Sequence, residues 1–270
     1  MKPIPRLLSC TAGLLFVAAA CDSGTSGRLG EVSLTASSLA EGSAPLGVFT
    51  TDTGWSVVLT EAKLVLAGVY AFAPDPAEQA ALASLFAPGL LAPGLARAHG
   101  GVDPLANRKV RAQWLDPLVF DALSAAPVEL GPELAELGAT DALELRLAPP
   151  PAELAPETQG HVAYVAGTAT RGSTTIDFEG GIDVPDVGTM RRIESIAFEA
   201  TLAAGGVVSL GLRPATWFRG VELERLPAPD PSTGVTALVA GSQPYEALRL
   251  GIRNPLAYEA SYEASAGGAP

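Results

Sequence analysis

The sequence predicts an all-β protein, an antiparallel β-sandwich with two short helices, and three observations lead to this class. Apolar and polar side chains alternate in many short segments, glycine-rich turns separate the segments, and no long helical pattern alternates with them. Alternation with period two is typical of strands that have one buried and one solvated face. Several such strands joined by tight turns indicate a sandwich rather than a parallel α/β sheet.

The alternating segments run along most of the chain. Charged residues such as Glu61, Glu144 and Glu199 fall between the apolar positions and are expected on solvated faces. The residues expected on the opposite, buried faces are Val58, Thr60, Ala62, Leu64 and Leu66; Leu143, Leu145 and Leu147; Ile176, Phe178 and Ile182; Ile196, Phe198, Ala200 and Leu202; Val208, Leu210 and Leu212; Tyr258 and Tyr262.

Two turns predict hairpins. Arg171-Gly172-Ser173 joins the segments 162–170 and 174–183, and the turn 203–206 (Ala-Ala-Gly-Gly) joins the strand ending at Leu202 to the one that follows. Pro149 to Pro151 can mark a domain boundary, but the strand spacing is alike on both sides. We therefore expect a single sandwich domain over residues 31–265.

Two helices interrupt the strands. The first is expected from Asp75, which can cap a helix that runs through residues 80–86 and ends at Pro88-Gly89. The second begins at Ser242, carries apolar residues on one side, and ends before Asn254-Pro255.

The amino terminus has the order of an export signal. Lys2 and Arg6 precede an apolar run over 7–17, which is too short to span a bilayer, and the alanines 18–20 lead into Cys21. We expect residues 1–20 to be a signal peptide. Ordinary cleavage near residue 20, which gives a free secreted protein, is the alternative.

The stretch Ala18-Ala19-Ala20-Cys21 resembles the lipobox of bacterial lipoproteins, with alanine at position 18 where leucine is usual. The resemblance implies that the Cys21 thiol receives a lipid and that residues 21–30, which are small and polar, form a tether. Localisation would then be exported and lipid-anchored in the bacterial cell envelope. The sequence leaves open whether the inner or the outer membrane is used.

Charge excludes some partners. The chain has a formal charge of −12, and loss of residues 1–20 leaves 15 basic and 29 acidic side chains. Because such an acidic surface repels phosphate backbones, no nucleic-acid partner is expected. It also disfavours peripheral binding to anionic lipid, so attachment to a membrane requires the N-terminal lipid as its anchor.

The chain holds only two histidines, His99 and His161, and lacks the common zinc, phosphate-loop and serine-hydrolase motifs. His99 lies on a glycine-rich loop with Asp103, upstream of Trp114, Asp116 and Asp121. A histidine near carboxylates supplies mixed ligands for a divalent metal. In the alternative interpretation, His99 is a solvated loop residue, Trp114 is core, and the aspartates belong to turns.

His161 begins an expected strand and is interpreted first as an exposed edge residue, with a ligand role as the alternative. The segment 217–220 (Trp-Phe-Arg-Gly) combines aromatics with a cation. It is expected either to line a groove for sugar or peptide or to plug the end of the sandwich, since aromatic side chains bury large areas.

Four pieces of the chain resemble a group of uncharacterised envelope lipoproteins of the myxobacterial type: 54–59 (GWSVVL), 99–101 (HGG), 113–115 (QWL) and 250–255 (LGIRNP). Some members are richer in histidine around the loop corresponding to 97–103, which suits metal handling, and this chain keeps only His99 there. The resemblance implies a protein of the envelope.

Together these features predict a lipid-anchored, non-enzymatic binding or interaction module of the cell envelope. Capture of a metal or small ligand through His99 and Asp103 would refine this function. The alternative is an envelope hydrolase that acts on glycan or peptide through a pair of carboxylates, which would require a concave pocket holding both.

Overall fold

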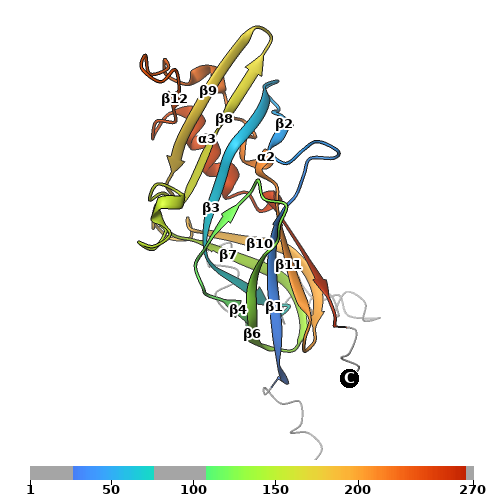
Figure 1. Cartoon of the computed structure of the whole chain (residues 1–270). Coiled ribbons are helices and arrows are strands. Elements are labelled where there is room, and N and C mark those ends of the chain that lie inside the picture. The colour runs from blue at the N-terminus through green and yellow to red at the C-terminus, as the bar shows by residue number, and fades with distance from the viewer. Residues whose placement is uncertain (1–26, 76–107, 266–270) are drawn as a thin grey trace, which may run out of the picture.

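The computed structural model describes residues 27–75 and 108–265 (Figure 1). The predicted signal peptide, Cys21, most of the tether, the body of the first predicted helix, His99 and Asp103 lie outside these residues. Within them the chain is mostly strand, and the predicted all-β sandwich is confirmed. No helix in the described ranges has the length and apolar character that a membrane span requires.

The smaller sheet has four strands in the order β13-β11-β1-β6. Its members are β1 (Leu29–Ser38), β6 (Val128–Glu136), β11 (Val207–Leu212) and β13 (Tyr258–Glu263). β1 begins and β13 ends at the same end of the molecule, at the bottom of Figure 1. The tether predicted for residues 21–30 would therefore reach the fold at this end.

The larger sheet is built on one long strand, β3 (Ser56–Phe72). Its path follows the order β10-β7-β3-β8-β9-β12, and three further short strands pair with β3. The other members are β2 (Val48–Thr50), β4 (Val110–Trp114), β5 (Leu118–Asp121), β7 (Gly138–Leu147), β8 (Ala163–Arg171), β9 (Thr174–Ile182), β10 (Arg192–Leu202) and β12 (Thr236–Ala237).

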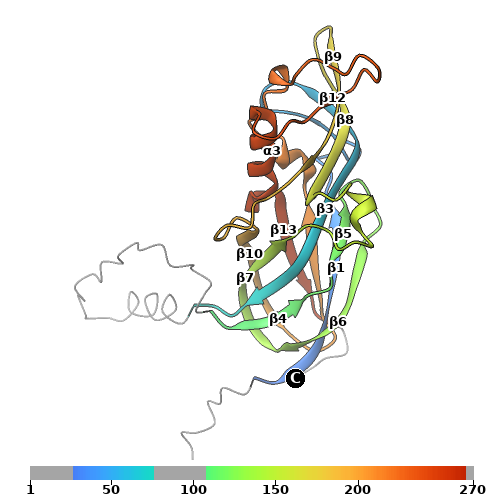
Figure 2. The ribbon, with the colours of Figure 1, turned by 90° about the vertical axis from the view of Figure 1, so that its left-hand side faces the viewer.

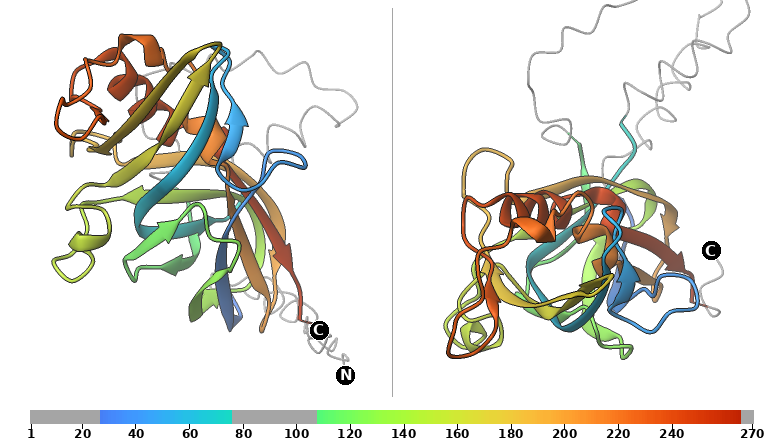
Figure 3. Two further views of the ribbon diagram at one scale, coloured as in Figure 1. Left: turned by 45° about the horizontal axis from the view of Figure 1, so that its top comes forward. Right: turned by 90° about the horizontal axis from the view of Figure 1, so that it is seen from above.

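The long strand divides the molecule into two regions. Its second half pairs with β7 and β4, and this part of the sheet faces the smaller sheet; we call it the sandwich region. Its first half pairs with β8 and β2 and is covered by helices; we call it the groove region. Figure 2 shows α3 beside the strands of the groove region, and Figure 3 shows the helices from above.

Two α-helices are described, α2 (Pro214–Trp217) and α3 (Gln243–Ile252). The second predicted helix is confirmed as α3: the Ser242 hydroxyl accepts a hydrogen bond from the Tyr245 amide, and Tyr245, Leu248 and Ile252 are buried. The short helix α2 was not predicted. Proline at its start suits a first helical position, and the helix follows β11 directly.

Most strand pairs are antiparallel, but β1 pairs with β11 and β12 with β9 in parallel. The second predicted hairpin is wrong, because β10 and β11 belong to different sheets. The Gly205 amide bonds to the Glu31 carbonyl, and the Tyr262 hydroxyl bonds to both backbone groups of Ala203. These contacts draw the turn 203–206 onto β1 and β13, so that the chain changes sheet there.

The inward face of β3 changes along its length. The strand shifts register against β8 between Leu59 and Glu61, so Val57 and Leu59 are buried before the shift and Ala62 and Leu64 after it. Val58, predicted as inward-facing, is therefore 46% exposed. An extra residue in a strand reverses which side chains face the core.

Glu144 is a second departure, since it was expected on a solvated face but is buried on β7. Its carboxylate pairs with Arg146 at 2.8 Å, and the Arg146 guanidinium lies over the Tyr70 ring, 4.2 Å from its centroid. The buried charge therefore has the partner that burial requires.

Candidate functional site

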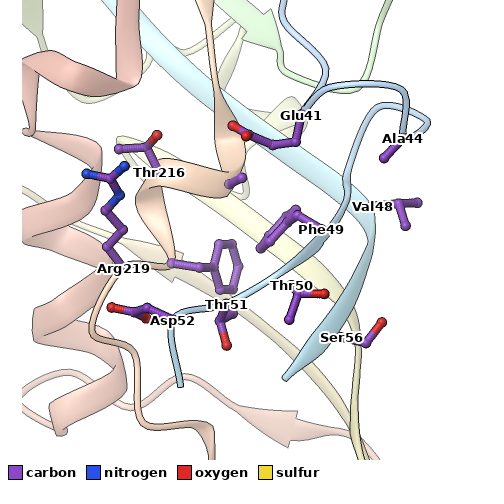
Figure 4. Close-up of a pocket in the computed structure, with 12 residues that line it drawn as sticks. Glu41, Ala44, Val48, Phe49, Thr50, Thr51, Asp52, Ser56, Thr216 and Arg219 are labelled. Carbon is purple, nitrogen blue, oxygen red and sulfur yellow. The ribbon is translucent and has the colours of Figure 1, made fainter. Parts of the chain in front are cut away.

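An open groove of about 560 Å³ lies in the groove region (Figure 4). This volume lies in the range of small-ligand pockets. One wall is the loop before β2 together with β2 itself, and the other is α2 with the residues that follow it. The lining residues are Glu41, Ala44, Val48, Phe49, Thr50, Thr51, Asp52, Ser56, Ala215, Thr216, Phe218 and Arg219.

The floor of the groove is aromatic. Phe49 of β2 and Phe218 lie with ring centroids 5.2 Å apart and ring planes tilted by 54°, and Phe218 also contacts Phe178 of β9 at 5.9 Å. All three rings are buried, so their packing fixes β2 against α2. The floor is rigid and apolar because it is the edge of the core.

One end of the groove is closed by the β2–β3 turn. Both carboxylate oxygens of Asp52 lie 3.0 Å from the Gly220 amide nitrogen, and the Thr53 hydroxyl donates to the Val221 carbonyl at 3.0 Å. Gly54 has a positive φ of 83°, which lets the turn close tightly. Although Asp52 is exposed, its hydrogen bonds to the Gly220 amide connect the two walls of the groove.

Arg219 stands beside this closed end and is exposed. In the described part of the chain, its guanidinium has no ion-pair or hydrogen-bond partner, although carboxylates outnumber basic groups. Only Arg28 and Arg253 share the lack of an ion pair among the described basic residues, and neither lines this groove. An unpaired guanidinium with its planar donors suits a carboxylate or phosphate of a ligand.

The segment 217–220 was expected either to line a groove or to plug the end of the sandwich, and it shows features of both. Trp217 is fully buried and belongs to the core, as a plug would. Arg219 is exposed in the groove, as a binding segment would be, and Phe218 lies fully buried beneath the groove lining. The side chains separate in this way because α2 ends at Trp217, and the chain turns out of the helix at Phe218 and Arg219.

The groove also holds the two carboxylates that a hydrolase would need, Glu41 and Asp52. Both are exposed, and the Asp52 oxygens accept from Gly220. A general acid for glycoside hydrolysis is usually a carboxylic acid in an apolar pocket. Neither side chain therefore has the apolar surroundings that are typical of such a general acid.

The predicted metal ligands His99 and Asp103 lie outside the described residues. Of their predicted neighbours, Trp114 is buried, and Asp121 accepts a hydrogen bond from the Leu123 amide at 2.9 Å as a turn residue does. Within the described ranges no group of three or more histidine, cysteine, aspartate or glutamate side chains is placed to hold a metal ion.

His161 lies just before β8, with its side chain 38% exposed. Its Nδ1 is 2.9 Å from the Asp183 carboxylate, and its ring lies against Gly181, where a Cβ atom would collide with it. Asp183 also lines a second cavity, of about 390 Å³, beside α3. The pair joins the ends of β8 and β9. His161 is partly exposed, as expected, but it precedes a strand that lies between β3 and β9 and is not an edge strand of the sheet.

A polar cluster of Trp55, Arg171 and Glu224 lies in the groove region, at the tip of the β8–β9 hairpin. The Trp55 indole donates to Glu224 at 3.1 Å, and Arg171 lies over the indole ring at 4.5 Å and pairs with Glu224 at 3.4 Å. A backbone hydrogen bond, the indole N–H and Arg171 together lower the pKa of Glu224. The cluster holds the tip of the β8–β9 hairpin against the segment after α2.

Comparison with family models, with curated proteins and with solved structures gave no match for this chain. The site therefore rests on its own geometry. The sequence did not point to its β2 wall. Residues 48–52 alternate over too short a span to stand out, although the following Asp52-Thr53-Gly54 has turn composition.

Proposed function

We propose that the protein is a lipid-anchored binding module of the bacterial cell envelope, and that it captures its ligand in the groove between β2 and α2. The observation that carries the proposal is the unpaired, exposed Arg219 at the closed end of a groove with an aromatic floor. Apolar walls supply affinity and a few polar groups fix orientation in small-ligand sites.

The placement of the groove supports this function. The described chain enters the fold at the lower end of β1, whereas β2 and α2, which form the walls of the groove, lie in the upper half of Figure 1. A lipid on Cys21 would thus hold the fold by one end and leave the groove accessible. The mixture of apolar, hydroxyl and charged groups suits a peptide or a sugar, whose apolar faces pack on apolar side chains while polar groups bond to the rim.

The anchor is tested in the native host or a related bacterium. The full chain is expected in the membrane fraction, with the mass of a lipid added at Cys21, and Cys21→Ser is expected to remove both properties. Mass spectrometry of the N-terminal peptide checks this. An unmodified N-terminus at residue 21 in the membrane fraction would contradict the proposed anchor.

The groove is tested with the full-length protein in detergent micelles. Two probe sets are titrated: a library of random nine-residue peptides and a panel of cell-wall oligosaccharides. Arg219→Ala is expected to lower the affinity for the selected probes by about tenfold or more, because a charge-assisted hydrogen bond is lost. Arg225→Ala is the matched control, since Arg225 is exposed nearby, pairs with Glu222 and lies outside the groove. No binding from either set, or equal loss in both variants, would refute the groove as the site.

A further inference from the structure

The backbone of β2 has an unpaired edge along the groove. β2 pairs with β3 only, in the register Val48–Val58, Phe49–Val57 and Thr50–Ser56. In the flanking pairs, the Leu59 amide donates to the Gly47 carbonyl and the Thr51 amide to the Trp55 carbonyl. Hydrogen-bonded and non-bonded pairs alternate in an antiparallel ladder, so Phe49 faces β3 with its backbone groups.

Val48 and Thr50 therefore direct their backbone groups away from β3. The Val48 amide donates a hydrogen bond to the Pro45 carbonyl, with 3.1 Å between nitrogen and oxygen. This leaves the Val48 carbonyl and both the amide and the carbonyl of Thr50, none of which bonds to another described residue. Both residues line the groove, and Thr50 is exposed.

Such an edge is a template for another extended chain. Natural sheets usually block their edges with charge, proline or a covering segment. None of the three residues of β2 is charged or a proline, and the edge faces a groove large enough for a chain. Peptide recognition by strand addition uses these features, with main-chain bonds for affinity and neighbouring pockets for specificity.

The charged group at the closed end adds a second requirement. A chain lying along β2 toward the β2–β3 turn meets Arg219, whose guanidinium has no partner among the described residues. An apolar side chain of the same peptide would contact the partly exposed apolar residues of the lining, Ala44, Val48 and Ala215, above the buried rings. The partner that complements the groove is thus an extended peptide with an apolar residue and a carboxylate.

We infer that the groove binds such a peptide as an added strand on β2, with the peptide's carboxylate on Arg219. This inference rests on the proposed function and names its ligand class. The Thr50 amide and carbonyl form a hydrogen-bonded pair with one peptide residue, and the Val48 carbonyl accepts from another amide. The carboxylate comes from an acidic side chain or from a free C-terminus.

Proline at position 50 tests the main-chain bonds. Thr50→Pro removes an amide that the fold does not use, at an edge position where proline is tolerated. Peptides selected from the nine-residue library are expected to bind at least about tenfold more weakly to Thr50→Pro. Thr50→Ala keeps the amide and removes only the side chain, so peptide affinity is expected to change little. Thermal unfolding of both variants should match that of the parent chain.

The same bonds are tested from the peptide, in case the proline variant fails to fold. A selected peptide is synthesised in forms methylated at one backbone nitrogen at a time. Strand addition predicts loss of binding at alternate positions, because only every second amide faces β2. A uniform loss or no loss along the peptide would overturn strand addition.

The source of the carboxylate is tested with two further forms of the peptide. One has an acidic side chain and an amidated C-terminus, and the other has a free C-terminus and no acidic side chain. The form that loses affinity in Arg219→Ala identifies the group that meets the guanidinium. Equal affinity of both forms for the parent and for Arg219→Ala would overturn the role of Arg219.

The outcomes separate this inference from the proposed function. Peptide binding that Thr50→Pro leaves unchanged would overturn strand addition while the groove stays a site. Binding of oligosaccharides alone, weakened by Arg219→Ala, would also overturn the peptide but support the groove. Failure of both probe sets would overturn the proposed function itself.

Discussion

The sandwich region and the groove region share the strand β3 but bury its two halves in different ways. In the sandwich region a second sheet covers the inner face, and β10 and β4 contact β13 and β6 at the two sides. In the groove region the helices α2 and α3 take the place of that sheet. Helices cover a face but do not bond to a strand edge, so β2 keeps unpaired backbone groups beside a groove.

The comparison also explains where charge is satisfied. In the sandwich region, the buried Glu144 is paired with Arg146, and Arg111 bonds to Glu136 at 3.0 Å. In the groove region, Arg219 lacks such a partner among the described residues. Ion pairs occur in both regions, such as Arg171–Glu224 in the groove region, but the guanidinium that lines the groove is not used in one. We propose that it meets a ligand instead.

The largest effect on stability is expected from the contact between the two helices. Gly251 of α3 lies against the backbone of Trp217, and a Cβ atom there would come within 2.2 Å of the Trp217 carbonyl oxygen. Gly251→Ala is expected to reduce the free energy of unfolding by about 3 kcal/mol, because backbone atoms must move apart. Urea unfolding of the full chain checks this value.

Gly131→Ala is the matched control for that change. Gly131 lies in β6 of the sandwich region, and its added Cβ would meet no atom within 4 Å. We expect a change within about 0.5 kcal/mol. Similar losses in the free energy of unfolding of both variants would contradict the expectation. They would mean that the contact between α2 and α3 is no more closely packed than the exposed surface of β6.

A smaller effect is expected from Glu224, which is half-exposed. Its pKa lies below the ordinary value of 4.5, so the carboxylate stabilises the fold above that pH and the contribution is lost as pH falls through the lowered pKa. Glu224→Gln should therefore be less stable than the parent near neutral pH, and the difference should shrink on acidification. Thermal unfolding between neutral and acid pH measures it.

Glu129→Gln removes an equal charge from the exposed face of β6 in the sandwich region and serves as the control. We expect no comparable loss near neutral pH, since surface charges without close partners contribute little. If the two variants followed the same pH profile, the cluster of Trp55, Arg171 and Glu224 would not distinguish the groove region.

Local pattern determined the strands and α3. Period-two alternation located β7, β9 to β11 and β13, the turn 171–173 located β8, and the cap at Ser242 located the start of α3, because these features depend on neighbours within a few residues. The predicted export signal and its Cys21 are also local patterns, and they stay predictions. The single strong departure in burial on β7, Glu144, has its reason in a contact with Tyr70 and Arg146 that local pattern does not contain.

Tertiary structure decided the pairing and the groove. The register shifts in β3 depend on β8, and the sheet change after Leu202 depends on contacts of the turn 203–206 with β1 and Tyr262. The groove joins residues 41–56 to 215–219, which only the packing of Phe49 on Phe218 brings together. The sequence by itself thus determined many of the strands and most of their apolar faces, with Val58 and Glu144 as the departures and β2 among the strands it did not indicate. Which segments meet was decided by long-range packing, since alternation carries no information about the partner of a strand.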